Sequence, residues 1–228
     1  KATATGHLDL IVKAYEQGKC SKYLGNLKVG DVVEMKGPIV KFKYEANTYE
    51  HVGMVAGGSG ITPMLQVADA MLDNPEDRTK ISLVFANETE ADIIMKKEID
   101  ALAGKYPGRF SVHYVVTKPD MMGLMWKGST GFITPEILKK HMPGPQKGNV
   151  VMVCGPPGMM NFVSGNKVSP QDQGEVSGVL KDLGYAKEHV YKFLVLEGSL
   201  REIKRERGWG DEREREIERE VKTDRDEG

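Results

Sequence analysis

Two glycine-bearing turns are the features of this sequence best suited to chemistry. The first reads AGGSGITP at residues 56–63 and the second reads CGPPGM at residues 154–159, each directly after an apolar segment. Glycines at a strand end let a ligand approach the backbone closely, and the amides of a following helix can bind phosphate. Neither standard nucleotide fingerprint fits, because Pro63 stands where GxGxxG needs a glycine and no Gly-Lys-Ser/Thr follows. We expect a phosphate or cofactor loop of another kind, with a purely structural turn as the alternative.

Cys154 is the most reactive side chain of the two turns. A nucleophilic cysteine needs an adjacent base, and the sequence shows none beside it. A small buried residue at a strand end is the usual role of a free cysteine. Cys20 is the only other cysteine, so there is no disulfide framework, and the five histidines are not at metal-ligand spacing. We therefore expect neither a cysteine nucleophile nor a metal site.

Composition narrows the class of protein. The chain has 228 residues, 39% of them hydrophobic, which is enough to bury a sizeable core. The net charge of −1 disfavours a dedicated nucleic-acid binder, which needs a basic excess. No apolar run approaches the roughly 20 residues of a membrane span.

The two turns lie within an alternation of strands and helices. Near-continuous apolar character is typical of strands that are buried on both faces of a parallel sheet. Five strands are expected, at 51–56, 81–86, 110–116, 150–154 and 189–193. Helices are expected from Pro63 with Thr62 as its N-cap, and at 94–104, 134–141 and 174–184. This order predicts a doubly wound, five-stranded α/β domain, whose ligands bind at the carboxyl ends of strands, where both turns lie.

The two ends of the chain differ from this central part. Strands are expected at 7–15 and 30–38, with a short helical piece at 21–27 between them, but two strands do not make a stable sheet. Residues 194–228 are mostly charged residues of both signs, so we expect a disordered or partly helical tail rather than an interaction helix.

Five ordered motifs resemble the NADH-cytochrome b5 reductases of the ferredoxin reductase superfamily. They are GKCSKYLGNLKVGD, KGPIVKFKY, GMVAGGSGITPMLQV, LVFANETEADII and VCGPPGMM, and the resemblance covers residues 6–193. The closing segment SGNKVSPQDQGEVSGVLKDLGYAKEHVYKF is most similar to the mitochondrial form from fungi. The resemblance implies an incomplete antiparallel FAD-binding β-barrel in residues 1–44, an NADH-binding α/β domain in residues 45–193, and the charged tail beyond.

The resemblance also assigns residues to FAD. It implies flavin contacts for Ile11 and Tyr15 and an NADH-side position for Lys13. The FAD pyrophosphate is expected on the stretch of Gly18, Lys19, Cys20 and Ser21, where backbone donors and a cation suit phosphate. Cys20 replaces a methionine of the family.

The first turn is expected to serve both cofactors. Thr62 matches the threonine beside the flavin, and Ser59 replaces a more usual threonine. The rest of the stretch makes room for the cofactors: Gly57, Gly58, Gly60 and Pro63.

The NADH positions follow in the same way. Asp92 matches an acidic position associated with NADH preference, because a carboxylate accepts from ribose hydroxyls and repels a 2′-phosphate. Cys154, Gly155 and Pro156 match the loop that holds the nicotinamide, and Phe193 matches the usual last residue of the family. Thr62 and Cys154 are thus expected nearest the reacting atoms.

The implied activity is electron transfer from NADH through FAD to cytochrome b5 or a similar haem protein. The cofactors carry the chemistry, so no acid–base pair is needed. The resemblance further implies a monomer in the mitochondrial outer membrane or intermembrane space, held to a membrane only through an N-terminal anchor outside this chain.

The chain also departs from the family. The Arg-x-Tyr-Thr/Ser motif that clasps the flavin is expected before Lys1, and Val40 stands where many relatives have glycine. We therefore expect a chain shortened at its N-terminus that binds FAD weakly or not at all. Two alternatives stay open: the flavin domain of a related enzyme such as a nitrate reductase, and a non-catalytic NAD-binding module. The tail could block the nicotinamide pocket or extend into solvent.

Overall fold

The computed structural model describes residues 6–35, 40–119, 126–169 and 171–193. They belong to two compact units, one formed by Lys1–Ile11 with Val32–Val195 and the other by Val12–Asp31 with Leu196–Gly228. The predicted domain boundaries at 44/45 and 193/194 stay a prediction, and the predicted tail lies outside the described residues. Within the described ranges, no helix combines the length and apolar character that a membrane span requires.

The first unit contains a six-stranded parallel sheet in the order β4-β3-β2-β1-β5-β6. The prediction of a doubly wound parallel sheet is confirmed, and all five predicted strands are present. The sixth, β4, is only two residues long and therefore shows no apolar periodicity. The strands are β1 (His51–Gly57), β2 (Lys80–Asn87), β3 (Phe110–Val116), β4 (Ser129–Thr130), β5 (Asn149–Cys154) and β6 (Val190–Lys192).

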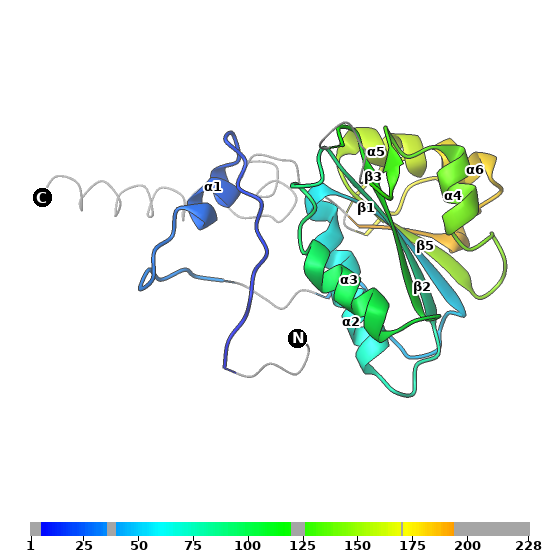
Figure 1. The fold of residues 1–228 in the computed structure, drawn as a ribbon, viewed down its shortest axis with the longest axis horizontal. Helices are drawn as coiled ribbons and strands as arrows, with labels where there is room; N and C mark the ends of the chain where they lie inside the picture. Colours follow the sequence, from blue (N-terminus) through cyan, green and yellow to red (C-terminus); the bar gives the residue numbers. More distant parts are fainter. Residues whose placement is uncertain (1–5, 36–39, 120–125, 170, 194–228) are drawn as a thin grey trace, which may run out of the picture. The chain divides into compact units, whose positions relative to one another are not determined.

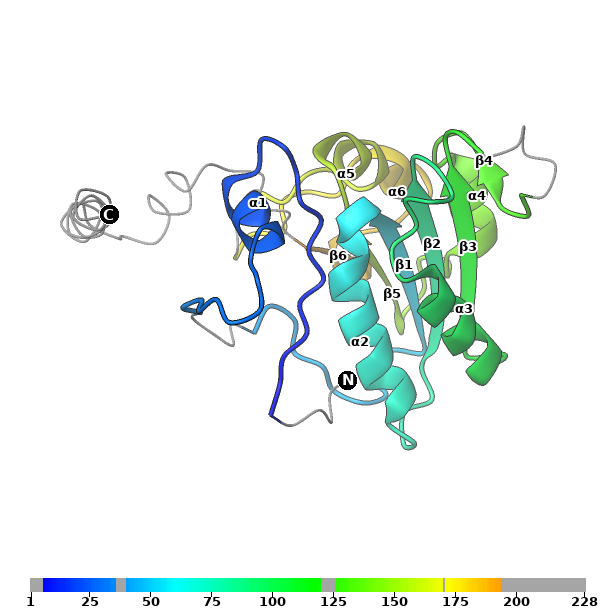
Figure 2. The ribbon, with the colours of Figure 1, turned by 60° about the vertical axis from the view of Figure 1, so that its left-hand side comes forward.

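Helices cover both faces of this sheet. Figures 1 and 2 show α2 and α3 on one face and α4, α5 and α6 on the other. Short 3-10 turns, η1 (Gly58–Gly60) and η3 (Lys187–His189), precede α2 and β6. The helices are α2 (Ile61–Asp73), α3 (Lys96–Lys105), α4 (Pro135–His141), α5 (Pro157–Val163) and α6 (Gly178–Asp182).

Helix starts were predicted with mixed success. Thr134 caps α4 as expected, accepting a hydrogen bond from the Ile137 N–H at 3.3 Å. Thr62 is not an N-cap, because η1 carries the chain straight into α2 and Gly60 precedes the helix. Helix α5 was not predicted; it begins at the second proline of the CGPPGM turn. The helix expected at 174–184 is confined to α6, since Gly174 and Gly178 both have positive φ.

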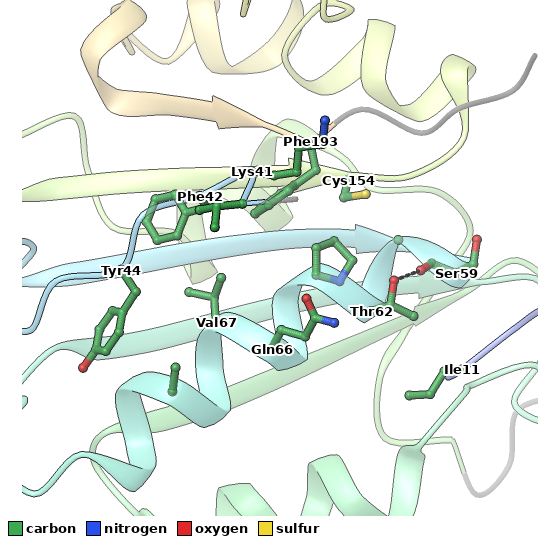
Figure 3. Close-up of a pocket in the computed structure, with 14 residues that line it drawn as sticks. Ile11, Lys41, Phe42, Tyr44, Ser59, Thr62, Gln66, Val67, Cys154 and Phe193 are labelled. Carbon is green, nitrogen blue, oxygen red and sulfur yellow. Dashed lines mark hydrogen bonds between the residues drawn. The ribbon is translucent and has the colours of Figure 1, made fainter. Parts of the chain in front are cut away.

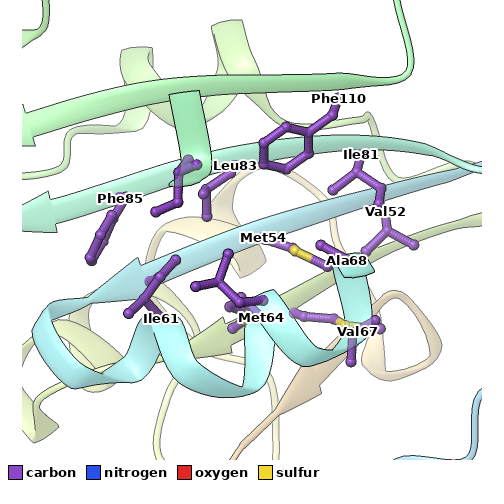
Figure 4. Close-up of a cluster of buried hydrophobic side chains, with 14 of the residues drawn as sticks. Val52, Met54, Ile61, Met64, Val67, Ala68, Ile81, Leu83, Phe85 and Phe110 are labelled. Carbon is purple, nitrogen blue, oxygen red and sulfur yellow. The ribbon is translucent and has the colours of Figure 1, made fainter. Parts of the chain in front are cut away.

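Each face of the sheet has its own hydrophobic core. On the α2/α3 face, Met54 and Phe85 of the sheet pack with Met64 and Ala68 of α2 (Figure 4). These α2 residues belong to the apolar face predicted from their spacing, which places i, i+3 and i+4 side chains on one side of a helix. Val55 and Val153 belong to the core of the opposite face. The two central strands β1 and β5 are therefore buried on both sides, as their apolar character indicated.

The strands expected at the start of the chain do not form. Residues 7–15 and 31–35 contain no strand, and residues 36–39 lie outside the described part. Leu8 and Leu10 are 74% and 52% exposed. The antiparallel barrel predicted for residues 1–44 is thus not formed in the described residues, because two isolated strand segments have no neighbours to complete a sheet. The short helix is present in the second unit as α1 (Lys19–Gly25).

A buried carboxylate fixes the segment that enters β1. Asp77, 1% exposed, lies between α2 and β2. Its carboxylate accepts hydrogen bonds from the Thr79 N–H at 2.8 Å and from the Tyr44 hydroxyl at 2.7 Å. Burial acts to raise the pKa of Asp77, but these hydrogen bonds to the charged form outweigh it and leave the pKa lowered. Asp77 thereby holds Tyr44 against the sheet unit.

Asp77→Asn is expected to destabilise the protein at pH 7 by about 1–3 kcal/mol, because a charged acceptor of two hydrogen bonds is lost. The pKa of Asp77 is lower in the folded protein than in the unfolded chain. Its contribution to the free energy of unfolding is therefore complete above the unfolded-state pKa, and it is lost as the pH falls through the folded-state pKa. The difference between variant and wild type should therefore shrink below about pH 4. Urea unfolding from pH 7 to pH 3 measures it, with Asp182→Asn on α6 as the exposed control. An equal difference at both pH values would contradict this account.

Candidate functional site

The order of the strands creates a crevice between β1 and β5. The chain runs outward from β1 through β2 and β3 to β4, then returns to place β5 on the other side of β1. Such a topological switch point is where doubly wound sheets bind ligands, at the carboxyl ends of the strands. Ala56 pairs with Cys154 at that end, so the two glycine-bearing turns leave the sheet side by side.

These two turns are in direct contact, and glycine makes the contact possible. A Cβ on Gly60 would lie 2.2 Å from the Cys154 carbonyl oxygen, and one on Gly57 would lie 2.9 Å from the Pro156 ring. Gly58 meets nothing nearby but has a φ of +51°, which L side chains rarely adopt. These glycines therefore have a structural role in the contact between the turns, and ligand binding at the same turns stays a prediction.

A cavity of about 560 Å³ opens beside the two turns, within the first unit (Figure 3). Seven predicted site residues line it: Ile11, Ser59, Gly60, Thr62, Pro63, Cys154 and Phe193. The other half of the lining was not predicted: Val40, Lys41, Phe42, Tyr44, Gln66, Val67 and Ala70. A signal for the last three was present, since residues 66, 67 and 70 follow Pro63 at helical spacing on α2.

The cavity suits a planar ring with a polar edge. Phe42 and Phe193 form part of its wall, with ring centroids 6.5 Å apart, and the Phe193 N–H is fixed by a 2.9 Å hydrogen bond to the Val153 carbonyl. The Thr62 hydroxyl lies at the opposite side and donates to the Ser59 carbonyl at 3.1 Å (Figure 3). A volume of this size is typical of small-molecule pockets. Apolar walls with a few polar groups fit a nicotinamide or flavin ring.

Cys154 contributes a thiol, not a thiolate, to this cavity. The residue is 4% exposed, and burial raises the pKa of its thiol to about 12. The thiolate is the nucleophilic form of cysteine, and it is scarce at neutral pH in such a site. The geometry therefore agrees with the expectation that Cys154 is not a nucleophile and supports a packing contact with a bound ring.

The remaining predicted NADH residues lie near the same sheet edge but do not line the cavity. Gly57, Gly58, Gly155 and Pro156 belong to the two turns themselves. Asp92 follows β2 and is half-buried. Its carboxylate accepts from the Thr89 hydroxyl at 2.8 Å and from the Thr89 N–H at 3.1 Å. The role of Asp92 toward a ribose stays a prediction.

Of the FAD residues predicted before residue 22, all except Ile11 belong to the second unit. They form a closed local turn, in which the Ser21 hydroxyl accepts from the Tyr15 N–H at 3.3 Å and the Gly18 N–H donates to the Tyr15 carbonyl at 3.0 Å. Gly18 is needed there, because a Cβ would lie 2.3 Å from the Ser21 hydroxyl. The other members are Lys13, with its ammonium 5.7 Å from the Tyr15 ring centroid, and Lys19 and Cys20 at the start of α1. Their predicted contact with FAD stays a prediction.

Comparison with known proteins places this architecture in a family. Residues 54–165 match the family model of the oxidoreductase NAD-binding domain, and residues 1–44 match that of the oxidoreductase FAD-binding domain. The NADH-cytochrome b5 reductase 2 of Pyricularia oryzae is 50% identical over 189 residues, which cover 82% of this chain and 56% of that protein. The chain belongs to the NADH-cytochrome b5 reductase family.

Two further relatives support the assignment to the cytochrome b5 reductases. The NADH-cytochrome b5 reductase-like protein of Arabidopsis thaliana is 48% identical over 83% of this chain and 57% of its own length. The solved cytochrome b5 reductase domain of Ulva prolifera nitrate reductase matches with a TM-score of 0.66 and 37% identity, over 77% of this chain and 66% of that one. The chain thus spans a little over half the length of the curated cytochrome b5 reductases that it matches.

Gly60→Ala is expected to destabilise the protein by about 3 kcal/mol or more, because its Cβ would overlap a backbone carbonyl that cannot move away freely. The matched control is Gly104→Ala in α3, where a Cβ meets nothing within 4 Å. That change should be neutral or stabilising by up to about 1 kcal/mol, since alanine has the higher helix propensity. Urea unfolding of both variants measures the difference, and equal stabilities would show that the two turns do not touch.

Iodoacetamide at pH 7.5 is expected to alkylate Cys20 and to leave Cys154 unmodified. Cys20 is exposed, whereas the Cys154 thiol is buried and its pKa is raised to about 12. Peptide mass spectrometry of the folded chain reads out both sites, and alkylation in denaturant supplies the control in which both react. Rapid labelling of Cys154 in the folded protein at pH 7.5 would mean that the thiol is ionised or open to solvent.

Proposed function

We propose that this chain is part of a flavoprotein oxidoreductase that passes electrons from NADH through FAD to cytochrome b5 or a similar haem protein. The observation that carries the proposal is the cavity at the switch point, where two touching glycine-bearing turns meet an aromatic wall. Family membership supplies the chemistry that such a cavity serves. The residues present fit a planar redox ring in shape and polarity.

The residues of the cavity would align the reactants. When bound, NADH supplies a hydride and FAD converts the electron pair into single-electron steps. Thr62 would offer its hydroxyl at the edge of the flavin, while Cys154 and the backbone of Gly155 and Pro156 would hold the nicotinamide. The apolar side chains around them exclude water from the transfer path. No side chain needs to gain or lose a proton for this task.

Preference for NADH is proposed to depend on Asp92. A carboxylate at the carboxyl end of β2 can accept from the ribose hydroxyls of NADH and would repel the 2′-phosphate of NADPH. Its hydrogen bonds from Thr89 hold the carboxylate in one orientation. This preorganisation supports the assignment, since an oriented acceptor loses less entropy on binding.

Partner and location are proposed from the family alone. The fungal and plant relatives are named for cytochrome b5, which makes a haem protein the proposed electron acceptor. The resemblance of the segment around residues 164–193 to the fungal mitochondrial form supports a mitochondrial location. A monomer, attached to the membrane only through an N-terminal anchor, is the form we propose for the flavoprotein.

A second candidate is a nucleotide-binding module without flavin chemistry. It is favoured by one observation: residues 7–15 and 31–35 form no strands, so the described part of the FAD-binding segment is not a barrel. The cavity and the turns beside it are complete without those strands. This candidate predicts binding of NADH without turnover.

The test is to purify residues 1–228, record the visible spectrum, and measure NADH binding and NADH-dependent reduction of ferricyanide and cytochrome b5. Bound flavin with turnover supports the oxidoreductase, and NADH binding without flavin supports the module. In a flavin-loaded protein, Thr62→Val should lower turnover about tenfold, since it removes one hydrogen-bonding hydroxyl from the site. Thr130→Val on exposed β4 is the matched control. Absence of both flavin and NADH binding would refute both candidates.

A further inference from the structure

The loop of residues 165–177, between α5 and α6, is described except at residue 170, and the proposed function does not explain the contacts of its described residues. Gly165 begins it with a φ of +78°, and the Ser177 N–H closes it with a 3.1 Å hydrogen bond to the Ser164 carbonyl. Inside it, the N–H groups of Val168 and Ser169 both donate to the Asp172 carbonyl, at 3.1 and 3.2 Å. The loop is therefore folded by its own backbone.

A buried lysine fastens this loop to β6. Lys192 is 1% exposed, and its ammonium donates to the Glu175 carbonyl at 2.7 Å and to the Asn166 carbonyl at 3.5 Å. The Lys192 N–H also donates to the Gln173 side-chain oxygen at 2.6 Å. Desolvation of an ammonium is costly unless it is hydrogen-bonded, so these carbonyls offset much of the cost. The next residue in the chain, Phe193, lines the cavity.

The fastened loop brings a second lysine to the wall of the cavity. The Lys167 ammonium lies 5.6 Å from the ring centroid of Tyr191. Tyr191 packs edge-on against Phe42 and Phe193, with centroids 5.2 and 5.0 Å away. Its hydroxyl donates to the carbonyl of Lys41, itself a lining residue of the cavity. Tyr191 thus contacts both the Lys41 carbonyl and the Lys167 ammonium, beside the cavity that Lys41 lines.

These two cations have no counter-ion. Within the described ranges, no carboxylate lies within 4.0 Å of either ammonium. Two acidic residues of the same loop are engaged elsewhere: the Asp172 carboxylate accepts from the Gly174 N–H at 2.9 Å, and the Glu175 carboxylate lies 4.0 Å from the Lys187 ammonium. Burial, and next the charge of Lys41, lower the pKa of Lys167. Two like charges held together favour an anion that relieves their repulsion.

We propose that Lys41 and Lys167 form a phosphate-binding site at the rim of the cavity, which takes the diphosphate of a dinucleotide whose ring occupies the cavity. Two ammonium groups offer six N–H donors to the oxygens of a diphosphate, and each contact is charge-assisted. The dinucleotide is named on the strength of the proposed function. The loop of residues 165–177 would then act as a positioning element for binding, beyond the two glycine-bearing turns.

The test is calorimetric titration of the full chain with NADH, with FAD and with inorganic pyrophosphate. Lys167→Gln and Lys41→Gln should each raise the Kd of one dinucleotide about tenfold, as expected for loss of one charge-assisted contact. The dinucleotide affected identifies whether NADH or FAD supplies the phosphate. Added salt should weaken binding to the wild type more than to either variant. The matched control is Lys181→Gln, an exposed lysine of α6 outside the cavity lining, which should leave each Kd unchanged.

The outcomes separate this site from the proposed function. Wild-type binding that neither Lys167→Gln nor Lys41→Gln weakens overturns the phosphate site and leaves the function standing. Failure of the wild type to bind either dinucleotide overturns both. An effect of the variants on pyrophosphate alone shows a site for the free anion and also overturns the proposal.

Amine acetylation provides a second readout that does not need turnover. The lowered pKa of Lys167 makes its amine more available to an acetylating reagent than an ordinary exposed lysine. A bound diphosphate should protonate and cover that amine, so saturating dinucleotide should lower its acetylation several-fold while Lys181 is unaffected. Equal protection of both lysines, or none, would contradict a phosphate at this site.

Discussion

The close approach of the turns after β1 and β5 is the constraint on which the site depends. Both strands end at the same level of a parallel sheet, so the chain segments leaving them must pass each other within van der Waals distance. Only the absence of a Cβ at Gly60 lets its backbone lie against the Cys154 carbonyl. The two segments then continue into helices on opposite faces, α2 on one and α5 on the other. Because α2 and α5 leave the contact between the two turns in different directions, a crevice forms beside that contact.

A second wall deepens that crevice into the cavity, which stays open to solvent on one side. It is made of Phe193 and of four residues that precede β1, and Tyr191 packs against Phe193 behind it. The four residues are Val40, Lys41, Phe42 and Tyr44. Polar contacts hold this wall at both ends, since Tyr44 donates to the buried Asp77 carboxylate and Tyr191 donates to the Lys41 carbonyl. The aromatic rings between them supply apolar area, while the hydrogen bonds fix their orientation. The geometry of the cavity therefore depends on a few buried polar groups.

The sequence predicted the sheet better than the site, because strands are recognised from consecutive residues, whereas a site also depends on residues far apart in the chain. Five strands could be predicted from apolar runs, because strands buried in a parallel sheet are rich in apolar residues. Strand β4 consists only of Ser129 and Thr130, so it has no apolar run. The turn residues of the cavity were predicted, because glycines at strand ends and the family motifs carry their signal in consecutive positions. Phe42 and Tyr44 were missed, since they reach the cavity through tertiary packing of a separate segment. The two N-terminal strands were predicted from local sequence patterns, and the barrel from the family resemblance. Neither kind of signal shows whether a strand has neighbours to pair with.

The buried ammonium of Lys192 carries a desolvation cost, but it fixes the position of a loop. An apolar side chain of similar length could fill its place in the core without the desolvation cost of an ammonium, and buried charges are weak evidence for stability. What an apolar residue could not do is bind two carbonyls of the loop of residues 165–177, those of Asn166 and Glu175. The loop has few buried apolar side chains of its own, Val176 being packed at the edge of one core. Its position beside Tyr191 therefore depends on hydrogen bonds from β6, and the same strand carries Phe193 into the cavity. One buried cation couples the loop to the wall of the site, so that the placement of Lys167 and the placement of Phe193 become parts of a single packing arrangement.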